Sequence, residues 1–181
     1  IQADLALYRA KAEGRNCFRF HSEDLDQQLQ ERMALTDELR SALGGNELEL
    51  HYQPQVELAS GRIIGLEALL RWNNPKRGSV APSIFIPIAE RTGLILVLGQ
   101  WVLDAACRQL RLWQDQGIAP KVTAVNCSAV QFKGSSELEH DVAASLGKWD
   151  IAPGMIELEL TESVLMEVTQ EHRDRFDRLR K

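Results

Sequence analysis

Apolar residues recur at helical spacing in the first 45 residues of the chain. They predict one helix over residues 3–12, a short strand over residues 17–20 and a second helix that begins at Ser22. The serine can cap this second helix, and Gly44-Gly45 ends it. Its leucines fall into two series that are out of phase, which indicates a stutter or an exposed connector that packs on two neighbours.

From residue 46 onward, strands alternate with helices. The pattern predicts strands over residues 47–58, 62–72, 121–127 and 155–161, and helices over residues 82–91, 94–116, 128–147 and 169–181. This alternation is typical of a parallel sheet built by helical crossovers, so the predicted fold class is α/β.

Two of the predicted helices have features that the structure can check. Pro82 can open the helix over residues 82–91, and Pro87 is expected to kink it or divide it in two. The helix over residues 94–116 is amphipathic, and its predicted apolar face includes Leu98, Val102, Ala105, Leu112 and Trp113. A loop is predicted between residues 73 and 81.

Composition and charge narrow the functional classes. The chain has 181 residues, 44% of them hydrophobic, and a net charge of −5, which argues against binding to a nucleic-acid polymer. Its three cysteines are scattered without metal-ligand spacing, which predicts free thiols in a reducing, cytoplasmic compartment. No apolar run reaches the roughly 18 residues of a membrane span.

The strand over residues 155–161 alternates leucines with glutamates, which are candidate functional residues. The leucines of this strand point one way, and Glu157 and Glu159 point the other way. If the leucines pack beneath helices, the glutamates face the inside of the sheet, where a carboxylate must be paired, protonated or bound to a cation. A solvated edge strand predicts the same alternation.

The strand over residues 62–72 repeats this arrangement. Glu67, Leu69 and Arg71 share one face of it. The carboxylate and the guanidinium can form a structural ion pair, or they can place a metal ligand beside a group that binds phosphate.

Asn126 lies at the end of the strand over residues 121–127. A lone asparagine there often caps a helix or forms a turn. However, Glu67, Asn126 and Glu159 would all lie near the carboxyl ends of strands, where α/β sheets and barrels place their sites. Three oxygen ligands suit Mg²⁺ or Mn²⁺ better than zinc.

Several of these residues also belong to segments that resemble a known family. GLEALLRW, at residues 65–72, is similar to the signature of the EAL family of bacterial cyclic-di-GMP phosphodiesterases. Three further regions resemble the same family in the expected order: HYQPQV, FIPIAERTGLI, and VNCSAVQF followed by IELELTES. The resemblance implies a modified TIM-type (β/α)8 barrel with an antiparallel first strand, incomplete in this chain.

The resemblance also implies an activity and a set of site residues. The family hydrolyses the second messenger cyclic-di-GMP to linear pGpG with two Mg²⁺ or Mn²⁺ ions, which neutralise the phosphodiester and activate water. By this resemblance Glu67, Asn126 and Glu159 are metal ligands, and Gln53, Leu69 and Arg71 contact the dinucleotide. Glu162 matches a glutamate that steadies a loop over the metals and at a homodimer interface.

The N-terminal residues resemble a different family. ADLALYRAKAEGRN is similar to the end of a GGDEF domain, the diguanylate cyclase module that often precedes EAL. The expected organisation is a GGDEF remnant over residues 1–20, a helical linker over 21–45 and an EAL-type domain over 46–181. The full-length protein would then carry an upstream GGDEF module. The sequence does not decide whether it is also anchored to the inner membrane.

Two alternatives to an active phosphodiesterase stay open. A degenerate EAL domain would bind cyclic-di-GMP as a receptor without cutting it, and a structural or dimerisation module would do neither. The paired aspartates that complete the family's metal site lie outside this sequence, so residues 1–181 alone are expected to be inactive.

Overall fold

The computed structural model describes residues 23–133, 138–160 and 170–179. Its elements are α2 (Glu23–Ala42), β1 (Leu48–Val56), β2 (Ile63–Asn74), β3 (Gly78–Val80), α3 (Pro82–Thr92), α4 (Leu94–Asp115), β4 (Thr123–Cys127), α5 (Ala129–Lys133), α6 (Leu138–Trp149), the 3₁₀ turn η1 (Pro153–Met155), β5 (Ile156–Leu160) and α8 (Gln170–Leu179). The expected helix, strand and domain remnant within residues 1–20 lie outside the described residues.

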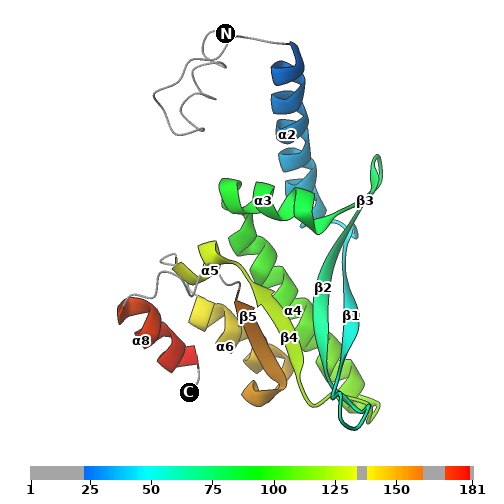
Figure 1. Ribbon diagram of the computed structural model, residues 1–181, viewed down its shortest axis with the longest axis vertical. Helices are drawn as coiled ribbons and strands as arrows, with labels where there is room; N and C mark the ends of the chain where they lie inside the picture. Colours follow the sequence, from blue (N-terminus) through cyan, green and yellow to red (C-terminus); the bar gives the residue numbers. More distant parts are fainter. Residues whose placement is uncertain (1–22, 134–137, 161–169, 180–181) are drawn as a thin grey trace.

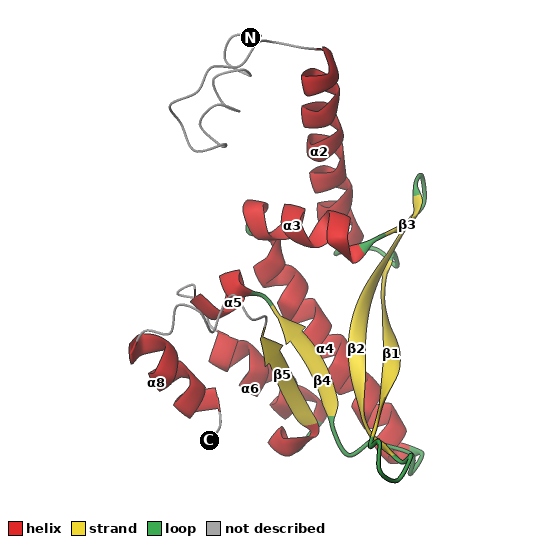
Figure 2. Cartoon of the chain, in the orientation of Figure 1, coloured by secondary structure: helices red, strands yellow, loops and turns green. Residues whose placement is uncertain are grey.

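The strands form one sheet in the order β1-β2-β4-β5, and the short β3 pairs with β2. β1 runs antiparallel to β2, whereas β2, β4 and β5 are parallel to one another (Figure 1). Helices α3 and α4 connect β2 to β4, and α5 and α6 connect β4 to β5 (Figure 2). Apart from β3, spatial order follows chain order, as it does in a barrel, and the antiparallel first strand is confirmed.

Apolar side chains of the sheet pack against α4. Ala68 of β2 and Val125 of β4 form a buried cluster with Val102, Leu103 and Ala106 of this helix. Burying a valine or leucine side chain contributes about 1.5–3 kcal/mol, so the contacts of Val102, Leu103 and Val125 hold the helix layer on one face of the sheet.

A glycine separates α3 from α4. Gly93 adopts a φ of 75°, in the left-handed region that glycine enters without a steric penalty, and it ends α3. The two helices are bent by 120° at this point. Among the described residues no single helix has the length and apolar character of a membrane span, and this bent pair meets those criteria by length and composition only.

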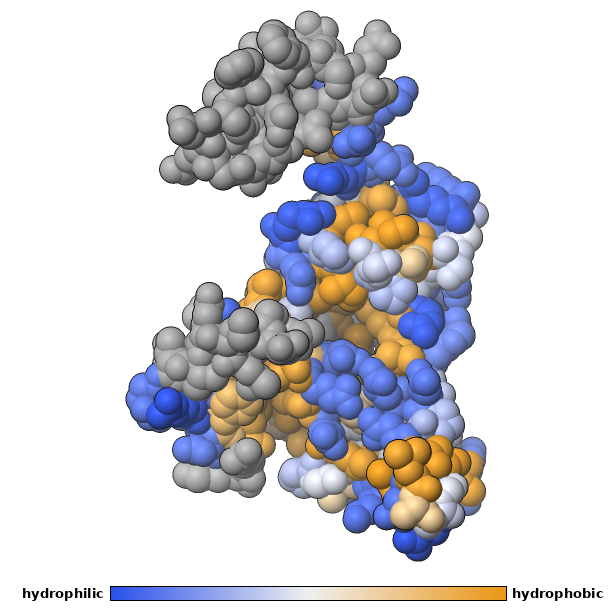
Figure 3. Space-filling model, viewed as in Figure 1, coloured by the Kyte–Doolittle hydropathy of each residue, from blue (hydrophilic) through white to orange (hydrophobic). Residues whose placement is uncertain are grey.

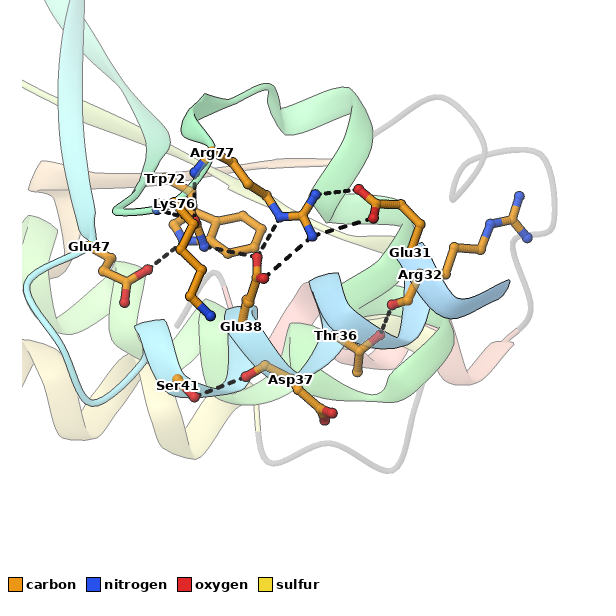
Figure 4. Close-up of polar contacts among 11 residues, drawn as sticks. Glu31, Arg32, Thr36, Asp37, Glu38, Ser41, Glu47, Trp72, Lys76 and Arg77 are labelled. Atoms are coloured by element: carbon orange, nitrogen blue, oxygen red, sulfur yellow. Dashed lines mark hydrogen bonds and ion pairs between the residues drawn. The ribbon is translucent and has the colours of Figure 1, made fainter. Parts of the chain in front are cut away.

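Helix α2 is docked on the domain by apolar and ionic contacts. Its Leu35, Leu39 and Ala42 are buried in a cluster that includes Trp72 of β2 and Phe85 of α3. Figure 4 shows the ionic part, in which the guanidinium of Arg77, from the β2–β3 turn, lies between two glutamates of α2. Its Nε donates to Glu38 Oε2 at 2.6 Å, and the same guanidinium pairs with Glu31. Its hydrogen bond to Glu38 lowers the pKa of that carboxyl.

The structure corrects three details of the sequence analysis. β3 lies in the segment predicted as a loop. α3 is not divided at Pro87 but runs on to Thr92, because the carbonyl deprived of a partner belongs to the exposed Ser83 in the first turn, where water can bind it. Leu112, predicted on the apolar face of α4, is 49% exposed, since it lies roughly 200° around the helix from buried Leu110.

Other exposed apolar side chains lie in the β1–β2 turn and just after α4. Figure 3 shows an orange group at the lower end of the molecule, where the β1–β2 turn and the end of α4 are found. Leu58, Ile63 and Ile118 are exposed in these segments. The group lies away from the carboxyl ends of β2, β4 and β5.

Candidate active site

The face of the sheet opposite α4 carries polar side chains. On β2, Glu67, Leu69 and Arg71 point away from the core that holds Ala68, as the sequence predicted. The β1 residue paired with Glu67 is Gln53, which is exposed on the same face. The candidate residues of β1 and β2 therefore share one surface.

The register of the parallel strands adds β4 and β5 to this face. Ala124 is the partner of both Glu67 and Glu157, and Asn126 is the partner of Glu159. Paired residues in neighbouring strands point to the same side, so Asn126 and both glutamates face the same way as Glu67. Glu157 is exposed, whereas Glu159 is half-buried.

A hydrogen bond joins two of the predicted ligands. Asn126 Nδ2 donates to Glu67 Oε1 at 2.7 Å. This bond uses the amino group of the asparagine side chain, which leaves the carbonyl oxygen as a possible ligand. Asn126 is thus not merely a helix cap, because its side chain is directed toward the carboxylate of β2.

Glu159 lies in an environment that disfavours its negative charge. Partial burial raises the pKa of this carboxyl above its ordinary value, and the charge of Glu67 raises it further. A hydrogen bond from Gln55 Nε2 to Glu159 Oε1, 3.2 Å long, opposes the rise, and Glu157 adds a smaller repulsion. A cation between Glu67 and Glu159 would relieve this repulsion.

Arg71 does not form the ion pair that the sequence left open. Among the described residues its guanidinium has no carboxylate partner, and its Nη1 donates to the carbonyl of Leu70 at 3.0 Å. The guanidinium is therefore available for an anion at the carboxyl end of β2.

A pocket of about 260 Å³ adjoins this end of the sheet. Leu69, Arg71 and Asn126 contribute to its wall, together with Pro82 and Glu90 of α3. The pocket is mainly apolar, with a few polar groups in its lining, which is the usual composition of a small-molecule site.

The donor set fits a hard divalent cation. Glu67, Asn126 and Glu159 supply two carboxylates and an amide oxygen on one face of the sheet, which are the ligand types that Mg²⁺ and Mn²⁺ prefer. Within the described ranges no three His, Cys, Asp or Glu side chains converge, so a metal held here would rely on the amide as its third ligand. The two cysteines that the structure describes do not add to this donor set. Cys107 and Cys127 are buried free thiols, and burial raises their pKa values to about 11 and about 12.

The structure brings together the predicted site residues that it describes. Gln53, Glu67, Leu69, Arg71, Asn126 and Glu159 lie on or beside one polar face, and Glu162 lies outside the described residues. Sequence analysis missed Gln55. Its phase on β1, two residues from Gln53, was the available signal.

The comparisons with known proteins agree with this geometry. Residues 36–181 match the EAL domain. MucR of Pseudomonas aeruginosa, a bifunctional diguanylate cyclase and cyclic di-GMP phosphodiesterase, is 46% identical over 166 residues, which are 92% of this chain and 24% of MucR. The cyclic di-GMP phosphodiesterase NbdA of the same species is 42% identical over 164 residues, covering 91% of this chain and 21% of NbdA.

A solved structure of a MucR phosphodiesterase in complex with c-di-GMP is also similar. It superposes with a TM-score of 0.76 at 44% identity, covering 81% of this chain and 59% of that one. The chain thus spans about a quarter or less of the curated relatives and a little over half of this solved domain. By sequence and by fold, the chain belongs to the EAL domain family.

Proposed function

We propose that this chain forms part of a phosphodiesterase that hydrolyses cyclic-di-GMP to linear pGpG in bacterial second-messenger signalling. The observation that carries the proposal is the placement of Glu67, Asn126 and Glu159 on one face of the sheet, with the Asn126–Glu67 hydrogen bond at 2.7 Å. Asn126 and Glu159 lie near the carboxyl ends of their strands, whereas Glu67 lies further back on β2, opposite Ala124. The relatives named for this activity support it.

The three oxygen donors would hold Mg²⁺ or Mn²⁺. When bound, two such cations neutralise the phosphodiester and lower the pKa of the attacking water. The neighbouring strands hold the two carboxylates and the amide oxygen at fixed positions. The metal ligands therefore need not reorganise during the reaction.

Other residues of the face would bind the dinucleotide. Arg71 offers paired donors to a phosphate, since no carboxylate among the described residues occupies it. Leu69 presents an apolar side chain next to it, and Gln53 offers an amide from β1. Glu162 would steady a loop over the metals.

The larger protein has expected partners as well. A homodimer through the EAL domain and an upstream GGDEF module in the same chain follow from the family resemblance. The names of relatives such as MucR, which combine cyclase and phosphodiesterase activity, support a tandem arrangement.

The test is a chromatographic assay of the protein with its complete EAL domain. Cyclic-di-GMP is incubated with Mg²⁺, with Mn²⁺, or with a chelator in excess. Conversion to pGpG with either metal, and none with the chelator, is the expected result. Tight binding of cyclic-di-GMP with no conversion under either metal would instead show a receptor.

A further inference from the structure

Gln55 makes a contact across the polar face that the family signature does not predict. It lies on β1, whereas its acceptor Glu159 lies on β5, at the other end of the strand order β1-β2-β4-β5. Three strand spacings amount to roughly 14 Å along a sheet. Side chains stand out from a sheet rather than along it, so a 3.2 Å hydrogen bond between the tips of Gln55 and Glu159 indicates that the sheet is curved, with the polar face on the concave side.

The sequence of β2 makes room for this contact. Gly65 is the register partner of Gln55, and it is buried. A Cβ atom added at Gly65 would lie 2.8 Å from Gln55 Oε1, and equally close to Cγ1 of Val122. Any other residue at this position would force the glutamine side chain away from its present path. Gly65 thus leaves the space that the Gln55 side chain occupies when it reaches Glu159.

The hydrogen bond also determines how the carboxylate is used. Gln55 donates to Oε1 of Glu159, which leaves the second carboxylate oxygen as the freer ligand. Carboxylates that ligate metals are commonly held by such hydrogen bonds, and loss of the supporting residue weakens metal binding.

We propose that Gln55 is a positioning residue, which orients the Glu159 carboxylate toward a divalent cation shared with Glu67 and Asn126. This inference rests on the proposed function, because it assumes that Glu159 ligates a metal. In this role Gln55 would contact the carboxylate of Glu159 rather than the metal or the substrate. It acts by fixing the rotamer of a ligand.

The experiment measures Mn²⁺ affinity by calorimetry in the protein with its complete EAL domain. Gln55→Met keeps the length of the side chain but removes the donor. Its Mn²⁺ dissociation constant is expected to rise about tenfold, with an unchanged melting temperature in the absence of metal. Gly65→Ala, whose new Cβ would crowd both Gln55 Oε1 and Val122, is expected to weaken Mn²⁺ binding in the same direction. Leu58→Ser, at a 99% exposed position on the same hairpin, is the control and should match the wild type.

The outcomes separate this inference from the proposed function. Wild-type Mn²⁺ affinity in Gln55→Met overturns the positioning role alone and leaves the metal site intact. Loss of the folded state in Gln55→Met would show a structural residue, which also overturns it. If the wild type binds no Mn²⁺, both the metal site and the positioning role fail.

At saturating Mn²⁺ a second readout applies. The mutant's KM for cyclic-di-GMP should equal that of the wild type, because the substrate contacts are unchanged. A raised KM with normal Mn²⁺ affinity would instead make Gln55 a substrate contact and contradict the proposal.

Discussion

Removing the Leu39 side chain tests whether α2 is an integral part of the domain. Leu39 has no exposed surface and packs in the cluster that includes Trp72 and Phe85. Leu39→Ala deletes buried carbon atoms and leaves a cavity between α2 and α3, which typically costs about 2–5 kcal/mol. Because small domains are stable by about 5–15 kcal/mol, the loss should be easily measured.

The assay is urea unfolding of the chain followed by circular dichroism, with the free energy of unfolding from linear extrapolation. Met33→Ala, on the same helix but at a position 69% exposed, is the matched control and should change the free energy by less than about 0.5 kcal/mol. Arg77→Gln, which removes the pairs with Glu31 and Glu38, should also lower the free energy of unfolding, because it leaves the mostly covered carboxylate of Glu38 without its cation. A Leu39→Ala protein as stable as the Met33→Ala control would refute the docking of α2.

Two further predictions concern the pocket and the helix layer. Arg71→Lys should weaken cyclic-di-GMP affinity by about 1–3 kcal/mol in a calorimetric titration, because lysine cannot reproduce the paired donors, and an unchanged affinity would remove Arg71 from the site. Gly99→Ala should destabilise the protein by about 1–3 kcal/mol, since the new Cβ would lie 1.8 Å from Nε2 of the buried Gln131. Gly147→Ala, in helix α6, is the control, because a Cβ atom added there would have no neighbour within 4 Å. This substitution should stabilise the protein by about 0.5–1 kcal/mol. Equal melting temperatures for the two variants would contradict the packing argument.

Strand phase predicted much of the site from sequence. The alternation of Glu67 with Ala68, and of Glu159 with its neighbouring leucines, correctly indicated which side chains share a face, because side-chain direction in a strand has a fixed period of two. The same reasoning placed Asn126 on that face. The alternation within each strand was therefore enough to predict which side chains share the polar face.

Features that depend on tertiary geometry were beyond this reasoning. The contact between Gln55 and Glu159 depends on the curvature of the whole sheet, which no local pattern encodes. The docked face of α2 could not be predicted, because its apolar residues form two series that are out of phase. Leu35 and Leu39, from the second series, are buried, whereas Met33, from the first, is exposed. Leu112 was misplaced because apolar character alone did not fix the centre of the buried face of α4.

The most direct test of the central claim compares two glutamates of β5 in the protein with its complete EAL domain. Glu159 is half-buried and hydrogen-bonded on the polar face, whereas Glu157, two residues earlier on the same face, is exposed. The rate of pGpG formation from cyclic-di-GMP in Mn²⁺ should fall to background in Glu159→Gln, because one anionic ligand is lost. It should stay near the wild-type rate in Glu157→Gln. Full activity in Glu159→Gln would contradict the account.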